Sequence, residues 1–327
     1  MTGKGLTDER TDRIKGAILG AACGNALGGS CVGLNHKAIL GAAGVAVLQD
    51  FVPGLTRSRF PSHRVGEVRS DFLLGLSLAE AVVEAGGRFD GAVLRKRFKG
   101  LLEDGEFLSS GVGALCLASM RRMVDGLPPS VDRLEAFHSA GAVRAFPLGC
   151  LPDRSEAVKI AVEQAELTHG NRSVAAAAAV IADSVASFVE GTRLDSEDDV
   201  RSYVGKELDL ARSIDGRFAD FWDDVAPDLD YSRQATDLPY SLVNVQASVN
   251  ECVPTAVGIF LIFRHDLEAA ICSAAVAGGE TDTVALVVGA LAGAYHGASR
   301  FPSRWLDKLS HKEQIDRVVK DLLSLWV

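Results

Sequence analysis

Hydrophobic residues along this chain recur at the spacing of helices, and no stretch of any length alternates with the period of a strand. The segments with helical spacing are Asp12–Gly28, Asp90–Leu102, Gly113–Met123, Ser173–Glu190 and Thr255–Phe263, followed by the apolar run Val284–Tyr295. Proline and glycine punctuate residues 33–66, which predicts loop with short helices, and the polar stretch 191–240 predicts exposed helix and loop. The pattern as a whole predicts an all-α protein of more than ten helices.

Two of the predicted helices carry glycine at every fourth position, which places the glycines on one face. The first stripe runs from Gly16 to Gly28 and the second from Gly289 to Gly297. Glycine is costly inside a helix, so a stripe of it needs a reason, and the close approach of two backbones supplies one. We expect these two helices to pack against each other at the centre of the fold; the alternative is that each packs against some other helix.

Length and charge limit the classes of protein to consider. The chain has 327 residues, of which 47% are hydrophobic, and its net charge is 34 − 43 = −9. We predict a polar leader over residues 1–11 and a single domain over residues 12–327. Because no basic cluster is long and no apolar run suits a membrane span, neither a nucleic acid nor a membrane is expected as a partner.

The cysteines and the N-terminal region indicate where the protein resides. The six cysteines are scattered among apolar neighbours without a Cys-x-x-Cys pair, which is typical of buried free thiols in a reducing compartment. The apolar run 17–32 follows Arg13 and Lys15, yet its glycine and asparagine content and the polar leader before it make a poor signal peptide. We therefore expect a cytoplasmic protein.

A cluster of oxygen-bearing side chains precedes the last apolar run. Glu280, Asp282 and Thr283 follow two glycines and open a helix that is apolar on every face. Two carboxylates and a hydroxyl at this spacing converge at the mouth of a helix, and hard cations such as Mg²⁺ prefer such ligands. The alternative is that these residues only cap the helix and complement its dipole.

The sequence Gly-Gly-Glu-Thr-Asp-Thr at 278–283, with the Gly-Ala-Leu-Ala-Gly-Ala-Tyr that follows it, resembles the last metal motif of the ADP-ribosylglycohydrolase family. That motif is usually Gly-Asp-x-Asp-Thr, so Glu280 stands where an aspartate is expected. The family includes ADP-ribosylarginine hydrolases and dinitrogenase reductase activating glycohydrolases, and it removes ADP-ribose from modified proteins with the help of Mg²⁺. The resemblance implies a compact, orthogonal multi-helix bundle.

The first helix resembles the opening motif of the same family, Gly-Ala-x-x-Gly-x-x-x-Gly-Asp-Ala-Leu-Gly, over residues 16–28. Asn25 replaces the family aspartate, and the resemblance places Asn25 at the substrate site. Many members carry a catalytic glutamate shortly after this motif, and the matching residue here is Val32. A valine side chain neither moves a proton nor binds a metal ion.

A third segment, Arg69-Ser70-Asp71-Phe72, lies over the family motif Thr-Asp-Asp-Thr when Leu78-Ala79-Glu80 is aligned with the family's Leu-Ala-Glu. Asp71 is the carboxylate that survives, and Arg69 introduces a cation where the family has a ligand. The alternative is that Ser70 or Asp71 is an ordinary N-cap.

Three more segments bear on the substrate pocket. The turn at 109–113 precedes a helix, so its backbone N–H groups can hold a phosphate; the alternative is an ordinary turn. Residues 138–144 resemble the family's Asn-Gly-Gly-Ala-Met-Arg, and 167–169 match its Leu-Thr-His, although a lone histidine there also suits a helix C-terminus. The predicted substrate-binding residues are Ser110, Gly111, Gly113, Ser139, Gly141, His169 and Asn25.

The resemblance implies hydrolysis of a glycosidic bond of an ADP-ribosyl group, with Asp71 and Asp282 as catalytic residues. It implies at most one ion, Mg²⁺ or Mn²⁺, held by Asp71, Glu280, Asp282 and Thr283, because these three carboxylates do not balance two divalent cations. The expected partner is an ADP-ribosylated protein or a free ADP-ribosyl nucleotide. Two alternatives are a non-catalytic ADP-ribose-binding protein and a structural protein with an empty pocket.

Overall fold

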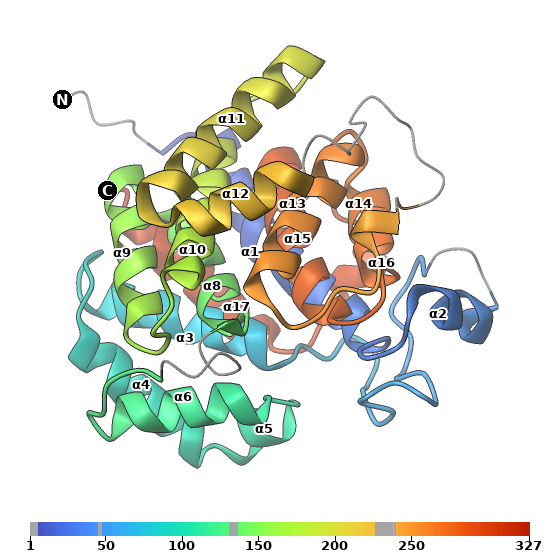
Figure 1. Ribbon diagram of the computed structural model, residues 1–327, viewed down its shortest axis with the longest axis horizontal. Coiled ribbons are helices and arrows are strands. Elements are labelled where there is room, and N and C mark those ends of the chain that lie inside the picture. Colours follow the sequence, from blue (N-terminus) through green and yellow to red (C-terminus); the bar gives the residue numbers. More distant parts are fainter. Residues whose placement is uncertain (1–5, 45–47, 131–136, 226–237, 239) are drawn as a thin grey trace.

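The structure is a computed structural model that describes residues 6–44, 48–130, 137–225, 238 and 240–327 (Figure 1). Its described residues contain helices and isolated bridges but no strand, so the predicted all-α class is confirmed. The α-helices are α1 (Asp8–Gly29), α2 (His36–Ala43), α3 (Ser70–Glu84), α4 (Gly91–Glu103), α5 (Gly105–Ser109), α6 (Ala114–Val124), α8 (Ala140–Val143), α9 (Arg154–Glu166), α10 (Arg172–Val189), α11 (Glu197–Ile214), α12 (Gly216–Val225), α13 (Val249–Ile262), α14 (Leu267–Ala275), α15 (Thr281–His296), α16 (Ser303–Leu306) and α17 (Lys312–Ser324). Short 3₁₀ turns are η1 (Phe146–Cys150), η3 (Tyr240–Leu242) and η4 (Ala298–Arg300).

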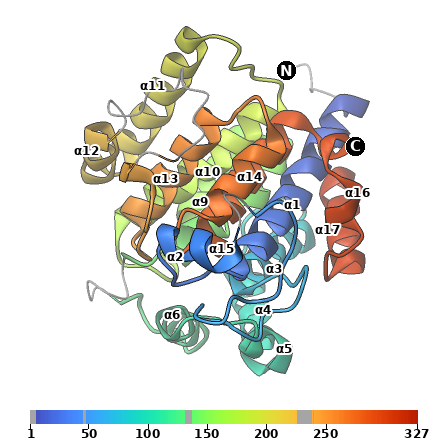
Figure 2. The same cartoon turned by 90° about the vertical axis from the view of Figure 1, so that its right-hand side faces the viewer.

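Helices α1 and α15 pack backbone against backbone at the centre of the molecule (Figures 1 and 2). A Cβ atom added to Gly20 would lie 1.9 Å from the carbonyl oxygen of Gly289, and one added to Gly293 would lie 2.0 Å from the carbonyl oxygen of Gly16. Every residue of α15 from Thr281 to Tyr295 is buried. The two glycine stripes therefore face each other, which confirms that these helices are central neighbours.

Two helices begin earlier than the sequence pattern predicts. Helix α1 begins at Asp8 rather than at Asp12 because the Thr7 hydroxyl caps it, accepting a hydrogen bond from the Arg10 N–H at 3.1 Å. The predicted boundary between leader and domain at residue 12 thus falls inside α1. Helix α13 begins at Val249 and contains Pro254, whereas we expected the helix to follow the proline. Only one backbone hydrogen bond near the helix start is lost to this proline, and neighbouring helices cover the segment.

The remaining helices surround the central pair. Among the described helices, α10 alone is long and apolar enough to cross a membrane, although we expected no such run; 89% of it is buried inside the domain, as in a core helix. Helices α11 and α12 lie on the outside and account for part of the polar stretch 191–240, of which residues 226–237 and 239 lie outside the described residues. All six cysteines are buried and free, as predicted.

The C-terminal end of α1, the start of α3 and the start of α15 meet at one end of the central pair. The carbonyl oxygen of Thr281 lies 2.3 Å from the position a Cβ atom would take on Gly28. The backbone N–H of Arg69, just ahead of α3, donates to the Asn25 side-chain oxygen at 2.6 Å. Three segments that are distant in the sequence therefore come together where the acidic residues begin.

Candidate functional site

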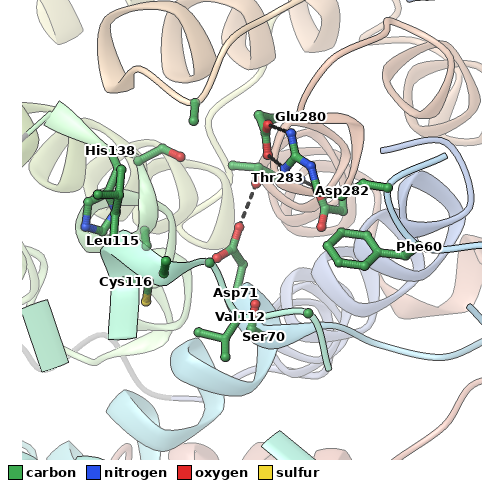
Figure 3. A pocket seen from close by; sticks show the side chains of 17 residues that line it. Phe60, Ser70, Asp71, Val112, Leu115, Cys116, His138, Glu280, Asp282 and Thr283 are labelled. Carbon is green, nitrogen blue, oxygen red and sulfur yellow. Dashed lines mark hydrogen bonds and ion pairs between the residues drawn. The ribbon is translucent and has the colours of Figure 1, made fainter. Parts of the chain in front are cut away.

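A pocket of about 410 Å³ opens where these three helix ends meet (Figure 3). Its walls come from the loop after α2, from the starts of α3, α6 and α15, and from the segment before α8. The lining residues are Arg59, Phe60, Ser70, Asp71, residues 111–116, residues 138–140, Ala247, Glu280, Asp282 and Thr283. The structure thus brings Asp71, Glu280, Asp282 and Thr283 to one pocket, as the sequence predicts.

Asp71 is a half-buried residue in the first turn of α3. The Thr283 hydroxyl donates a hydrogen bond to its Oδ2 atom at 2.6 Å (Figure 3). Burial, followed by the neighbouring Asp282 carboxylate, raises the pKa of Asp71 to about 7, while the hydrogen bond from Thr283 acts in the opposite direction. A carboxyl group with this pKa can both give and take a proton near neutral pH.

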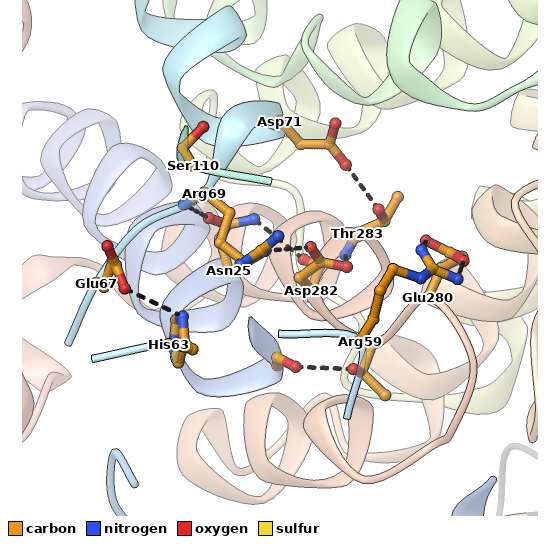
Figure 4. Close-up of polar contacts among 12 residues, drawn as sticks. Asn25, Arg59, His63, Glu67, Arg69, Asp71, Ser110, Glu280, Asp282 and Thr283 are labelled. Atoms are coloured by element: carbon orange, nitrogen blue, oxygen red, sulfur yellow. Dashed lines mark hydrogen bonds and ion pairs between the residues drawn. The ribbon is translucent and has the colours of Figure 1, made fainter. Parts of the chain in front are cut away.

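Asp282 forms a buried ion pair with an arginine that enters from outside its own helix (Figure 4). The Arg69 Nε atom donates to Oδ2 of Asp282 at 3.0 Å, and Oδ1 of Asp282 accepts the Thr283 N–H at 3.0 Å. The Arg69 and Asp282 side chains are 5% and 11% exposed. The face of the guanidinium covers the Phe60 ring, with 3.3 Å between Cζ and the ring centroid.

Glu280 is paired in the same way with Arg59, at the mouth of the pocket. The Arg59 guanidinium donates to both carboxylate oxygens, at 2.7 and 3.1 Å. These hydrogen bonds are the main cause that raises the pKa of Arg59. The backbone N–H of Arg59 donates to the carbonyl of Val32 at 2.7 Å. The segment that carries valine in place of the expected glutamate therefore holds the arginine in position.

Helix capping does not explain these acidic residues. Glu280 occupies the N-cap position of α15, but its side chain accepts no capping hydrogen bond. Arg69 occupies the N-cap position of α3, again without a side-chain cap, so Ser70 and Asp71 lie inside the first turn. Asp282 accepts one local N–H, from Thr283, but Glu280, Asp282 and Asp71 each also accept a hydrogen bond from a side chain of another segment.

The arrangement does not fit the divalent ion that the resemblance implies. Each carboxylate oxygen of Glu280 and Asp282 already accepts a hydrogen bond from an arginine or a backbone N–H group. Among the described residues, no three side chains of His, Cys, Asp or Glu are grouped as ligands for a metal ion. A cation at Asp282 would also stand beside the Arg69 guanidinium and be repelled by it. No chemical step is therefore assigned to a metal ion.

Three of the predicted substrate-binding residues, Gly111, Gly113 and Ser139, line the pocket. Ser110 lies behind it, because its hydroxyl turns back to donate to the Phe107 carbonyl at 2.6 Å. Asn25 is fully buried between α3 and α15, where its amide donates to the Asp282 carbonyl at 3.4 Å. Asn25 thus positions Arg69 and Asp282 from behind the pocket wall.

His169 and Gly141 also lie behind the pocket wall. The His169 Nε2 atom lies 3.0 Å from Nε2 of His138, which does line the pocket. Burial lowers the pKa of His138 to about 4 and that of His169 well below its usual value, so both rings are neutral near pH 7. Gly141 leaves space for the His169 ring, whose Nδ1 atom would lie 2.4 Å from an added Cβ atom. His169 therefore contacts His138 from behind and supports that part of the pocket wall.

Sequence reasoning missed Arg59 and Phe60, which belong to the region 33–66 that we predicted as connecting loop. No local pattern marks them, because their partners Glu280 and Arg69 come from other segments. The available signal was indirect: Glu280 and Asp282 open a buried helix, and buried carboxylates require a cation.

Comparison with known proteins agrees with this fold. Residues 6–327 match the sequence profile of ADP-ribosylglycohydrolase, and the chain belongs to that family. It is 24% identical over 320 residues to the uncharacterized protein YegU of Escherichia coli K12, covering 94% of each chain. It is 23% identical over 320 residues to an uncharacterized protein of Archaeoglobus fulgidus, covering 96% of this chain and 97% of the other.

The fold is similar to that of a solved structure of an ADP-ribosylglycohydrolase-related protein complex. The TM-score is 0.72 at 23% identity, and the match covers 98% of this chain and all of the other. The multi-helix fold expected from the resemblance is therefore confirmed.

Proposed function

We propose that this chain hydrolyses a glycosidic bond of an ADP-ribosyl group, carried by a modified protein or by a free nucleotide. The observation that carries the proposal is the Asp71 carboxyl group, which faces the pocket while the Thr283 hydroxyl holds one of its oxygens at 2.6 Å. Membership of the ADP-ribosylglycohydrolase family supports the class of bond. The buried free thiols fit a cytoplasmic protein, which we propose as well.

The acidic end of the pocket suits the charge that develops during such a reaction. As the bond to the ribose breaks, the sugar carbon gains oxocarbenium character and needs nearby negative charge. The side chains of Asp282 and Glu280 supply carboxylate oxygens there, and each accepts hydrogen bonds from an arginine. Asp71 has no arginine on its carboxylate among the described contacts, and it is the group placed to transfer a proton between the leaving group and water.

The other end of the pocket suits a nucleotide. Helix α6 begins at Ala114 without a side-chain cap, and its first residues line the pocket together with the turn at 111–113. Free N–H groups at a helix start attract phosphate oxygens. The apolar side chains of Val112 and Leu115 offer surface to a base or a ribose.

The Asp71→Asn variant should lose hydrolysis and keep binding. The asparagine is the same size and can still accept the Thr283 hydrogen bond, but it cannot transfer a proton. We expect the rate of ADP-ribose release from ADP-ribosylated arginine peptides to fall by about 10²–10⁴-fold. ADP-ribose should raise the melting temperature of the variant and of the wild type alike.

A matched control is Asp125→Asn, which changes an exposed aspartate at the end of α6, outside the pocket lining. This variant should retain wild-type hydrolysis. Equal hydrolysis by the Asp71→Asn and Asp125→Asn variants would contradict the role of Asp71.

The second candidate is a non-catalytic protein that binds ADP-ribose. It is favoured by the Arg59–Glu280 and Arg69–Asp282 pairs, because arginine hydrogen bonds engage two of the three carboxyl groups that line the pocket. A wild-type chain that ADP-ribose stabilises, but that releases none from ADP-ribosylated peptides or O-linked ADP-ribosyl esters, would establish this candidate instead.

A further inference from the structure

We propose that the guanidinium groups of Arg69 and Arg59 stand in place of divalent cations. This member of the family then holds no metal ion at its acidic cluster, which consists of Asp71, Glu280 and Asp282. The inference concerns ion binding and does not depend on whether the chain hydrolyses its ligand. It rests on the two ion pairs, on the side chains that hold Arg69 in position, and on the charge that remains in the pocket.

Arg69 is a buried residue that the surrounding side chains hold in position. Its backbone N–H is held by Asn25, its guanidinium lies between the Phe60 ring and the Asp282 carboxylate, and the residue is 4% exposed. Gly111 makes the space for it: a Cβ atom added to Gly111 would lie 1.6 Å from Nη2 of Arg69. Three side chains and one glycine, from four segments, thus surround one buried cation.

Asn25 completes the substitution. The amide accepts from the Arg69 N–H through its oxygen and donates to the Asp282 carbonyl through its nitrogen, at 2.6 and 3.4 Å. An aspartate at this position, as in the family motif, has no donor for that carbonyl and would add a buried negative charge. The neutral amide therefore matches a site whose positive charge comes from arginine.

The charge balance leads to the same conclusion. Three carboxylates (Asp71, Glu280 and Asp282) face two guanidinium groups, which leaves at most one negative charge, 3 − 2 = 1. A divalent ion binds carboxylate oxygens at about 2.0–2.6 Å, so it would have to displace an arginine from its hydrogen bonds. The displaced Arg69 would then be buried without its partner, which is costly.

Arg59 differs from Arg69 in that its side chain is 51% exposed at the mouth of the pocket. Arg59 is therefore the first of the two cations that an entering ligand contacts, whereas Arg69 is buried behind the pocket lining. Ligand binding at this site should accordingly proceed without Mg²⁺ and in the presence of a chelator.

Titration of the full chain with Mn²⁺, followed by the electron paramagnetic resonance signal of the free ion, tests this inference directly. The wild type should leave the signal of the free ion unchanged, and EDTA should not lower its melting temperature. The Arg59→Ala/Arg69→Ala double variant should lower the signal of the free ion, because removal of both guanidinium groups leaves the negative charge of Glu280 and Asp282 uncompensated.

The matched control is Arg57→Ala/Arg64→Ala, which removes the same charge from two exposed arginines of the same segment. It should bind no more Mn²⁺ than the wild type. A wild-type chain that binds one Mn²⁺ at its acidic cluster would overturn the inference, as would a folded double variant that binds none. If the double variant does not fold, Arg59→Ala alone should bind Mn²⁺ more tightly than Arg57→Ala, and equal binding would overturn it.

Discussion

Replacement of Gly20 by leucine is expected to destabilise the domain by about 3 kcal/mol or more, at the upper end of the cost of overpacking. The reason is that even the first added atom, Cβ, would lie 1.9 Å from the carbonyl oxygen of Gly289. The obstacle is backbone in a fully buried helix, so it cannot turn aside as a flexible side chain would. Gly293→Leu should have a similar effect, because its Cβ would meet the Gly16 carbonyl oxygen at 2.0 Å.

Gly100→Ala is the control for the glycine itself. Gly100 is an exposed glycine within α4, and nothing lies within 4 Å of an added Cβ atom. Because alanine favours a helix, this variant should be more stable than the wild type by up to about 1 kcal/mol. Urea unfolding measures all three free energies. Unchanged stability in Gly20→Leu and Gly293→Leu would contradict the direct contact of α1 and α15.

Asp282→Asn is expected to lower the free energy of unfolding by about 3–5 kcal/mol, the range found when one partner of a buried ion pair is removed. The substitution leaves the Arg69 guanidinium buried without a carboxylate at 3.0 Å. Arg69→Met should be destabilising for the corresponding reason. The double variant Arg69→Met/Asp282→Asn should cost less than the sum of the two, because neither charge is then left alone.

Glu197→Gln is the control for an ion pair at the surface. Glu197 pairs with Arg201, and their side chains are 52% and 71% exposed, so loss of this pair should cost about 1 kcal/mol or less. Strictly additive effects of Arg69→Met and Asp282→Asn in urea unfolding would show that the two side chains do not depend on each other. That outcome would contradict the proposal that Arg69 is the cation that balances the charge of Asp282.

The glycine stripes show that a local sequence pattern can predict a contact between two helices. Glycine at every fourth residue has a cost that only close packing repays, so the contact between the Gly16–Gly28 and Gly289–Gly297 segments can be inferred without knowing the fold. Helix starts were less predictable where a second signal competed. Thr7 caps α1 ahead of the apolar pattern, and Pro254 is tolerated inside α13.

At the site, the sequence predicts the acidic residues but not the arginines that pair with them. Its acidic residues were predicted from their order along the chain, and the structure places Asp71, Glu280 and Asp282 in one pocket. The partners of these residues were not predicted, because Arg59 lies 221 residues from Glu280 in the sequence and nothing local distinguishes it from other loop arginines. Arg69 was recognised as an unusual cation, but only the fold shows that it pairs with Asp282.

A crystal structure of the chain with ADP-ribose, grown in the presence of EDTA, tests the central claim most directly. The account predicts ADP-ribose in the pocket between the turn at 111–113 and the acidic cluster, with the distal ribose hydrogen-bonded to the Asp71 carboxyl group. The Arg69–Asp282 and Arg59–Glu280 pairs should remain in place. ADP-ribose bound at another surface, or bound here only after Mg²⁺ is added and the arginine pairs are broken, would contradict it.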